Sequence, residues 1–364
     1  MISWTGKPSA NKTNPAMDSI PQVDTVVARF MKKYNVPGMS IAIAKDGKLV
    51  YVKGYGYANT STGEKVKPSH LFRIASVSKP FTAVAILQLV EAGRLSLDAK
   101  VFGDGGILGN KYGSPPPNSN IKNIRVHQLL QHTCGGWTND SHDPMFTDIS
   151  LSHAQVIANT LKNEALINEP GKAYAYSNFG YCVLGRIIEK ISGISYENYV
   201  KRNILSKAVI SDMQVGGNRL VDKKQNEVVY YGQGNEDPYR YNISRMDSHG
   251  GWIASAADLL RFVFCVDGFS TKPDILNAAT IKTMTTASTA NERYACGWSV
   301  NTANNWWHNG SLPGTGSELV RANNGFSWAI LANTRSGDKD FGIDMDRLIW
   351  YAVKDTTLHW TSVE

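Results

Sequence analysis

The sequence lacks the features that would assign it to several large classes of protein. It has no run of about 18 apolar residues, so a membrane-spanning helix is not expected. It has only four cysteines, with no C-x-x-C spacing, so neither a zinc site nor a thioredoxin-type pair is indicated. The cysteines are expected to be buried free thiols, although the sequence leaves their pairing open: Cys134, Cys182, Cys265 and Cys296.

The usual metal and nucleotide motifs are also missing. There is no H-E-x-x-H, no G-x-x-x-x-G-K-[ST] and no true G-x-G-x-x-G, because the glycines between Gly103 and Gly109 have other offsets. A G-x-S-x-G nucleophile elbow is absent, which argues against an α/β-hydrolase. We therefore expect no metal and no other cofactor.

The charge of the chain gives no sign of a nucleic-acid partner. The 38 basic and 31 acidic side chains of the 364 residues leave a net charge of +7, but no basic run exceeds two residues. A small molecule or a short peptide is the expected partner, and the oligomeric state stays open. Met1–Gln22 is polar and lacks the apolar stretch of a secretory signal. Either the protein is intracellular or its signal is absent from this chain.

Hydrophobic periodicity predicts strands at both ends of the chain. An amphipathic helix over Ile20–Tyr34 precedes a hairpin of Met39–Lys45 and Lys48–Tyr57, joined by Asp46-Gly47. Strand patterns return near the C-terminus and are followed by one helix: Ala295–Asn301, Trp306–Asn309, Gly316–Arg321, Phe326–Asn333, then Phe341–Val353.

The middle of the chain is predicted to be mainly helical. The expected helices are Phe81–Ala92, Val126–Gln131, His153–Asn163, Phe179–Ile191, Tyr196–Asn203 and Ala256–Val266, and Gly103–Asn120 is expected to be a loop. We predict an α/β (α+β) fold, in which one antiparallel sheet built from both chain ends is flanked by helices. The sheet domain would contain residues 1–100 and 286–364, and the inserted helical domain residues 101–285.

A serine and a lysine three residues apart open the predicted helix Phe81–Ala92. In this Ser-x-x-Lys pattern the two side chains lie one helical turn apart, so the amine can take the proton of the hydroxyl. The pattern occurs four times, and only Ser76/Lys79 borders a buried helix; the others lie in polar, turn-like sequence: Ser9/Lys12, Ser119/Lys122 and Ser336/Lys339.

Pro80 locates the start of this helix. A proline ring is tolerated only in the first turn of a helix, so the helix must begin close to Ser76. Its free N–H groups would then stabilise an oxyanion beside that hydroxyl. A serine N-cap followed by a solvated lysine would leave the same pattern.

Two further segments carry residues suited to catalysis. Tyr176-Ser177-Asn178 can place a phenol and an amide on one side of a cleft, although Tyr57/Asn59 and Tyr196/Asn198 have the same spacing. His308-Asn309-Gly310 ends a predicted strand, and a glycine on an exposed edge would allow a substrate to approach closely.

In order and spacing, these three segments resemble the motifs of the penicillin-recognising serine hydrolases. That superfamily includes class C β-lactamases, DD-peptidases, and β-lactamase-like esterases and D-amino-acid amidases. Further similarity covers roughly residues 20 to 335, in Leu71–Ser76, Val126–Gly136, Tyr176–Gly185, Gly250–Leu259 and Gly297-Trp298. The resemblance implies a serine hydrolase that needs no cofactor and works in the periplasm or outside the cell, with a cytoplasmic location as the alternative.

Each site role follows from the resemblance, residue by residue. Ser76 would be the acylated nucleophile, and Lys79 with Tyr176 the general base and proton shuttle. Asn178, His308 and Gly310 would bind the substrate, and the N–H groups of Ser76 and Ser311 would form the oxyanion hole.

His308 departs from the lysine that β-lactamases usually have at this place. A partly charged histidine suits the carboxylate of a β-lactam less well and favours an esterase, a D-aminopeptidase or amidase, or a DD-peptidase. A class C-type β-lactamase, a non-catalytic or slowly turning over penicillin-binding protein, and an acyltransferase on the same fold stay open as alternatives. Five tryptophans near the motifs would suit either an aromatic-lined cleft or the core: Trp137, Trp252, Trp298, Trp306 and Trp307.

Overall fold

The structure is a computed structural model that describes residues 20–140 and 142–363. Most of the polar N-terminal segment, and with it the Ser9/Lys12 pair, lies outside these residues. Within the described part of the chain, no helix is both long and apolar enough to cross a bilayer. The four cysteines are free; three are buried and Cys265 is partly exposed.

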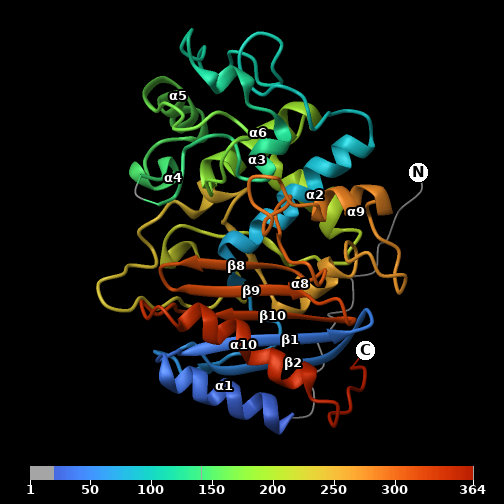
Figure 1. The fold of residues 1–364 in the computed structure, drawn as a ribbon. Helices are drawn as coiled ribbons and strands as arrows, with labels where there is room; N and C mark the ends of the chain where they lie inside the picture. Colours follow the sequence, from blue (N-terminus) through green and yellow to red (C-terminus); the bar gives the residue numbers. More distant parts are fainter. Residues whose placement is uncertain (1–19, 141, 364) are drawn as a thin grey trace, which may run out of the picture.

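One antiparallel sheet joins the two ends of the chain, as predicted (Figure 1). Strands from the N-terminal hairpin pair with strands from the C-terminal region, and Ile41 lies opposite Ile330 at the junction. The strand order is β3-β2-β1-β10-β9-β8-β7. The bounds are β1 Gly38–Lys45, β2 Lys48–Asn59, β3 Glu64–Lys65, β7 Ser299–Val300, β8 Trp306–Leu312, β9 Thr315–Arg321 and β10 Phe326–Ala332.

Two amphipathic helices cover one face of the sheet, α1 (Pro21–Lys33) and α10 (Phe341–Lys354) (Figure 1). Both were predicted from helical spacing of apolar residues. Their buried faces share one hydrophobic cluster with this face of the strands, including Phe30, Trp328 and Ile349.

The other face packs against α8 (Ala256–Val263), which contacts β1, β2 and β10. Beyond it lies α2 (Ser78–Glu91), whose side chains are buried on nearly all sides. The predicted start of this helix near Ser76 is confirmed, because a 3-10 turn over Ala75–Val77 leads directly into it. Gly93 ends it with a φ of 65°, a conformation that glycine adopts without strain.

Helices dominate the region between the two halves of the sheet. They are α3 Val126–Leu130, α4 Pro144–Thr147, α5 His153–Asn163, α6 Asn178–Ser192, α7 Tyr196–Val200 and α9 Ala278–Thr285, with a π-helical turn over Lys201–Leu205. The sequence did not predict α4 and α9, which are short. The division into domains at residues 100 and 286 stays a prediction.

A small sheet, also not predicted, supports the segment before Ser76. Its order is β4-β6-β5, with β4 Phe72–Arg73, β5 Gln214–Val215 and β6 Trp252–Ala254. Strands of two or three residues are too short to show an alternating pattern. Phe72 lies opposite Ala254, so this sheet ties the entry of α2 to the chain that follows Gly251.

Candidate active site

Ser76 lies in the 3-10 turn between β4 and α2. The preceding residue, Ala75, has a φ of 45°, which is costly for a residue other than glycine. The Ile74 N–H donates to Trp252 O at 3.0 Å and so holds the turn against the small sheet. The sequence gives no signal for the strained conformation at Ala75. Ala75 and Ser76 both line a cavity.

Lys79 places its amine at the centre of the candidate site. Its Nζ lies 3.0 Å from Ser76 Oγ, 2.7 Å from Asn178 Oδ1 and 2.9 Å from His249 O. These three acceptors come from three separate parts of the chain. The lysine and the serine of the first motif are therefore in hydrogen-bond contact, and Asn178 of the second motif joins them.

Burial controls the protonation of this lysine. The side chain has no exposed surface. Loss of solvation holds the pKa of Lys79 well below its usual value of 10.5, and the charge of Asp143 opposes that shift. A neutral amine can accept the Ser76 proton, so the site has the chemistry of a general base.

Asp143 fixes the orientation of Asn178. Asn178 Nδ2 donates to Asp143 Oδ2 at 2.7 Å, so Asn178 Oδ1 faces Lys79. The Asp143 carboxylate also accepts from the N–H of Met145 at the start of α4. Burial raises the pKa of Asp143 above its usual value of 3.8, while these donors and Lys79 oppose the rise. Sequence reasoning missed this residue, because nothing in its local sequence marks it as the partner of Asn178, which lies 35 residues further along the chain.

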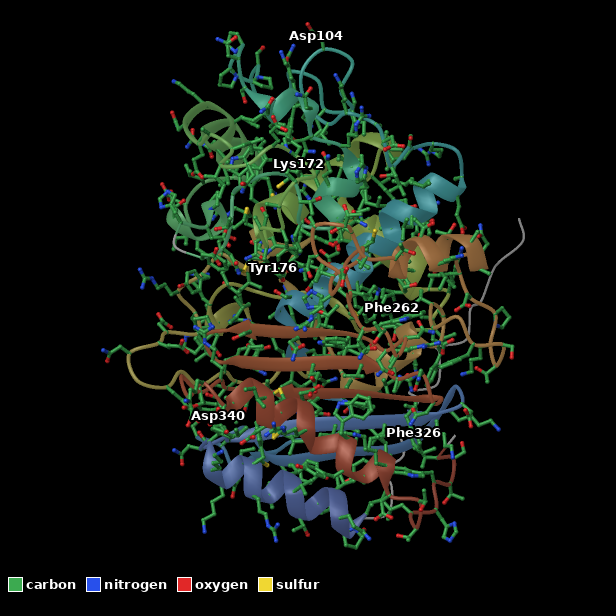
Figure 2. The ribbon with its side chains drawn as sticks, in the orientation of Figure 1. Asp104, Lys172, Tyr176, Phe262, Phe326 and Asp340 are labelled. Atoms are coloured by element: carbon green, nitrogen blue, oxygen red, sulfur yellow. The ribbon has the colours of Figure 1, made fainter. Side chains whose placement is uncertain are left out.

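Tyr176 lies between the helical region and the sheet (Figure 2). Its ring centroid is 4.8 Å from Lys79 Nζ. Burial raises the pKa of the phenol above its usual value of 10, and a hydrogen bond with Ser76 opposes the rise. The phenol is therefore protonated at neutral pH and lies next to both residues of the first motif.

Three other copies of the two patterns, all among the described residues, lack such an arrangement. Ser119 caps a 3-10 turn and Lys122 donates to Pro117 O on the surface. Tyr57 is 38% exposed on β2. Tyr196 is buried and bonds to Thr82 instead.

His308 is buried with both ring nitrogens engaged inside the protein. Its Nε2 lies 3.0 Å from Tyr294 Oη, and its Nδ1 donates to Asn309 O at 2.7 Å. Burial, together with the nearby charge of Lys79, lowers the pKa of His308 to about 3. The ring is therefore neutral and buried.

Gly310 allows close approach by the protein's own chain. A Cβ at this position would lie 2.4 Å from Ile74 O and 2.2 Å from Ser317 Oγ. Ser317 Oγ in turn donates to Ile74 O at 2.7 Å. Gly310 thus lets β8 lie close to Ile74, and its predicted role in substrate binding stays a prediction.

A cavity of about 230 Å³ opens beside Ser76. Of the other predicted site residues, Asn178 and Ser311 also line it, whereas Lys79, Tyr176, His308 and Gly310 do not; Gly250 of the Gly-Gly-Trp segment is part of the lining too. The lining combines apolar or aromatic side chains with polar ones: Phe146, Tyr241, Met246, Leu312 and Pro313, together with Asn139, His249, Ser311 and Arg335. The five tryptophans do not line it; four are buried and Trp307 is partly buried.

Arg335 is another residue that sequence reasoning missed. It forms a salt bridge with Glu236 and donates to Ser311 Oγ at 3.2 Å. It reaches the cavity from the chain after β10, so nothing in its local sequence marks it. Among the described residues, no group of three or more His, Cys, Asp or Glu side chains could hold a metal ion.

A profile of the β-lactamase family matches residues 23–351. The chain belongs to the β-lactamase family. Protein flp of Staphylococcus aureus is 32% identical over 188 residues, which are 52% of this chain and 36% of that protein. Penicillin-binding protein 4* of Bacillus subtilis is 32% identical over 218 residues, 57% of this chain and 44% of that protein. This β-lactamase-family chain therefore matches less than half the length of these curated relatives.

Solved structures show the same fold. The octameric penicillin-binding protein homologue from Pyrococcus abyssi has a TM-score of 0.74 at 27% identity, covering 93% of this chain and 78% of that one. D-amino acid amidase from Ochrobactrum anthropi SV3 has a TM-score of 0.74 at 22% identity, covering 93% and 99%. A class C β-lactamase has a TM-score of 0.74 at 21% identity, covering 92% and 96%. The last two support the β-lactamase-family fold alone.

Proposed function

We propose that this protein is a serine hydrolase that cleaves ester or amide bonds through an acyl-enzyme on Ser76. The observation that carries the proposal is the 3.0 Å contact between a fully buried Lys79 amine and the Ser76 hydroxyl, beside a cavity. A desolvated amine next to a hydroxyl is the arrangement that activates a serine nucleophile.

The reaction has two steps. Neutral Lys79 takes the Ser76 proton as Oγ attacks the carbonyl carbon, and the tetrahedral oxyanion is held by the N–H groups of Ser76 and Ser311. The leaving group then departs with a proton supplied through Tyr176. Water attacks the ester of Ser76 in the second step, releases the acid and restores the hydroxyl.

Asn178 would hold the acyl side of the substrate. One hydrogen of its Nδ2 is used by Asp143. The second is available to a carbonyl in the cavity that Asn178 lines. The Asp143 contact would keep this donor in place.

The charges of the site favour a substrate that is neutral on the leaving-group side. His308 is uncharged, and Arg335, the one cation among the described residues that line the cavity, is already paired with Glu236. Phe146 and Leu312 offer an apolar surface to the acyl group. Esters and amides of apolar acids therefore fit the site better than a β-lactam, whose carboxylate requires a cation.

Turnover of three chromogenic substrates tests the proposal: p-nitrophenyl acetate, D-Ala-p-nitroanilide and nitrocefin. We expect hydrolysis of the ester or the anilide to exceed that of nitrocefin, and Ser76→Ala to lower it at least about a thousandfold. Ser119→Ala, in another Ser-x-x-Lys pattern, is the matched control and should leave the rate unchanged. Fast nitrocefin turnover would favour a β-lactamase instead, and a stable penicilloyl adduct a slow penicillin-binding protein.

A further inference from the structure

A chain of four hydrogen bonds connects the second and third motifs behind the site. The Ser177 N–H donates to His132 Nδ1 at 3.1 Å, and His132 Nε2 lies 3.2 Å from Tyr294 Oη. Tyr294 Oη lies 3.0 Å from His308 Nε2, whose ring ends the chain on Asn309 O at 2.7 Å. The two rings and the phenol between them are all buried.

The two ends of the chain determine its direction. A backbone N–H can only donate, so His132 Nδ1 carries no proton and the neutral ring must carry it on Nε2. A carbonyl oxygen can only accept, so His308 Nδ1 carries the proton and its Nε2 is bare. Tyr294 therefore accepts from His132 and donates to His308, and each bond has one donor and one acceptor.

The surroundings oppose a charge on either ring. Burial lowers the pKa of both histidines, and the charge of Lys79 lowers it further. His308 also lowers the pKa of His132, while the hydrogen bond to Asn309 opposes the shift at His308. The other titratable groups around the rings are phenols: Tyr174, Tyr176, Tyr181 and Tyr294. A second proton on His308 would also point an N–H at a hydroxyl oxygen that already accepts from His132.

We infer that His132 and Tyr294 are positioning residues of the site, which hold His308 as a neutral ring protonated on Nδ1. Through the bond to Asn309 O, the ring fixes the peptide plane that leads into Gly310 and Ser311. Through Ser177, the same chain holds the segment between Tyr176 and Asn178. The two motifs are thereby kept in register across the site. The catalytic consequence of this inference rests on the proposed function. The direction of the hydrogen bonds does not depend on it.

Nitrogen-15 NMR of the ring nitrogens tests the direction without any substrate. In protein labelled at histidine, we expect His308 to show a protonated Nδ1 and a bare Nε2, and His132 the reverse, with no titration between pH 5 and 8. The variants His308→Asn and His132→Asn assign the signals. A His308 signal that titrates near pH 6.5, or a proton on its Nε2, would overturn the inference.

Tyr294→Phe tests the positioning role, because it removes only the hydroxyl that joins the two rings. The matched control is Tyr174→Phe, whose ring packs against the same His132 and Tyr294 at 6.0 and 5.8 Å. We expect Tyr294→Phe to shift both Nε2 signals, to raise the pH at which His308 titrates, and to lower kcat/KM about tenfold with a new acidic limb.

The control should keep the wild-type spectrum and pH profile. Unchanged ring signals in Tyr294→Phe, or changed signals with an unaltered pH profile of kcat/KM, would contradict the positioning role. If the wild type hydrolyses nothing, the proposed function fails, and the spectrum of the wild type still decides the hydrogen-bond direction.

Discussion

The Lys79 amine lies 3.0 Å from the Ser76 hydroxyl and has no exposed surface. Ser76 lies in the 3-10 turn that leads into α2, and Lys79 lies in the first turn of α2, where Pro80 is tolerated because the first turn of a helix needs no N–H donor. The local sequence thus brings the pair together, while the packing around α2 removes water from the amine. The following predictions test what each part contributes.

Lys79→Arg should abolish general-base catalysis while keeping a long side chain with N–H donors at this position. A guanidinium stays protonated at any accessible pH, so it cannot accept the Ser76 proton. We expect kcat/KM for p-nitrophenyl acetate to fall by about 10²–10⁴-fold. Lys122→Arg, from the surface Ser-x-x-Lys pattern, should leave it unchanged. Equal rates for Lys79→Arg and the wild type would exclude Lys79 as the base.

Asp143→Asn should move the pH dependence of acylation to lower pH. The amine must be neutral to work, so kcat/KM rises with pH as Lys79 loses its proton. Asp143 favours the charged amine, so its loss lowers the pKa of Lys79 further. Asp140→Asn removes an equal charge from an exposed site in the same loop and should shift nothing. A shift of the acidic limb to higher pH would contradict this electrostatic role.

Tyr176→Phe should slow the reaction without unfolding the protein. It removes the hydroxyl that bonds to Ser76 but keeps the ring beside His132, 4.1 Å between centroids. We expect kcat to fall by about 10²-fold or more, with a larger loss for an anilide than for an activated ester, because the poorer leaving group needs the proton. Tyr57→Phe, from a second Tyr-x-Asn pattern, is the control. Equal losses for the two substrates would argue against proton delivery.

Gly310→Ala should disturb the segment that carries Ser76. The new Cβ would lie 2.4 Å from Ile74 O, so β8 and the 3-10 turn must separate. We expect a loss of about 1–3 kcal/mol in the free energy of unfolding, together with a loss of activity. Gly337→Ala meets nothing within 4 Å and is the matched control. Denaturant titration of both variants measures the difference. Unchanged stability and activity of Gly310→Ala would show that the close approach of Ile74 to this position does not require glycine.

Much of the fold could be predicted because its elements carry strong local signals. The Asp46-Gly47 turn between alternating strands identified the hairpin of β1 and β2, and the apolar spacing of α1 identified that helix. Of the strand predicted over Ala295–Asn301, only Ser299–Val300 is a strand in the structure. The rest of that segment is irregular chain. Short elements such as β4 and α9 lack enough residues for a periodic pattern.

The candidate site was only partly predictable, because the sequence shows residue types and not their environment. Ser76, Lys79, Tyr176 and Asn178 were identified by their order and spacing. The low pKa of His308 comes first from its burial, and Arg335 is paired with Glu236, which lies 99 residues away in the sequence. Asp143 was missed for the same reason.

The mass of the intact protein after treatment with a fluorophosphonate tests the central claim most directly. This reagent forms a stable phosphonyl ester with an activated serine and releases fluoride. We predict one adduct on the wild type, none on Ser76→Ala, and an unchanged adduct on Ser119→Ala. An unlabelled wild type, or an adduct that persists in Ser76→Ala, would contradict the assignment of Ser76 as the nucleophile.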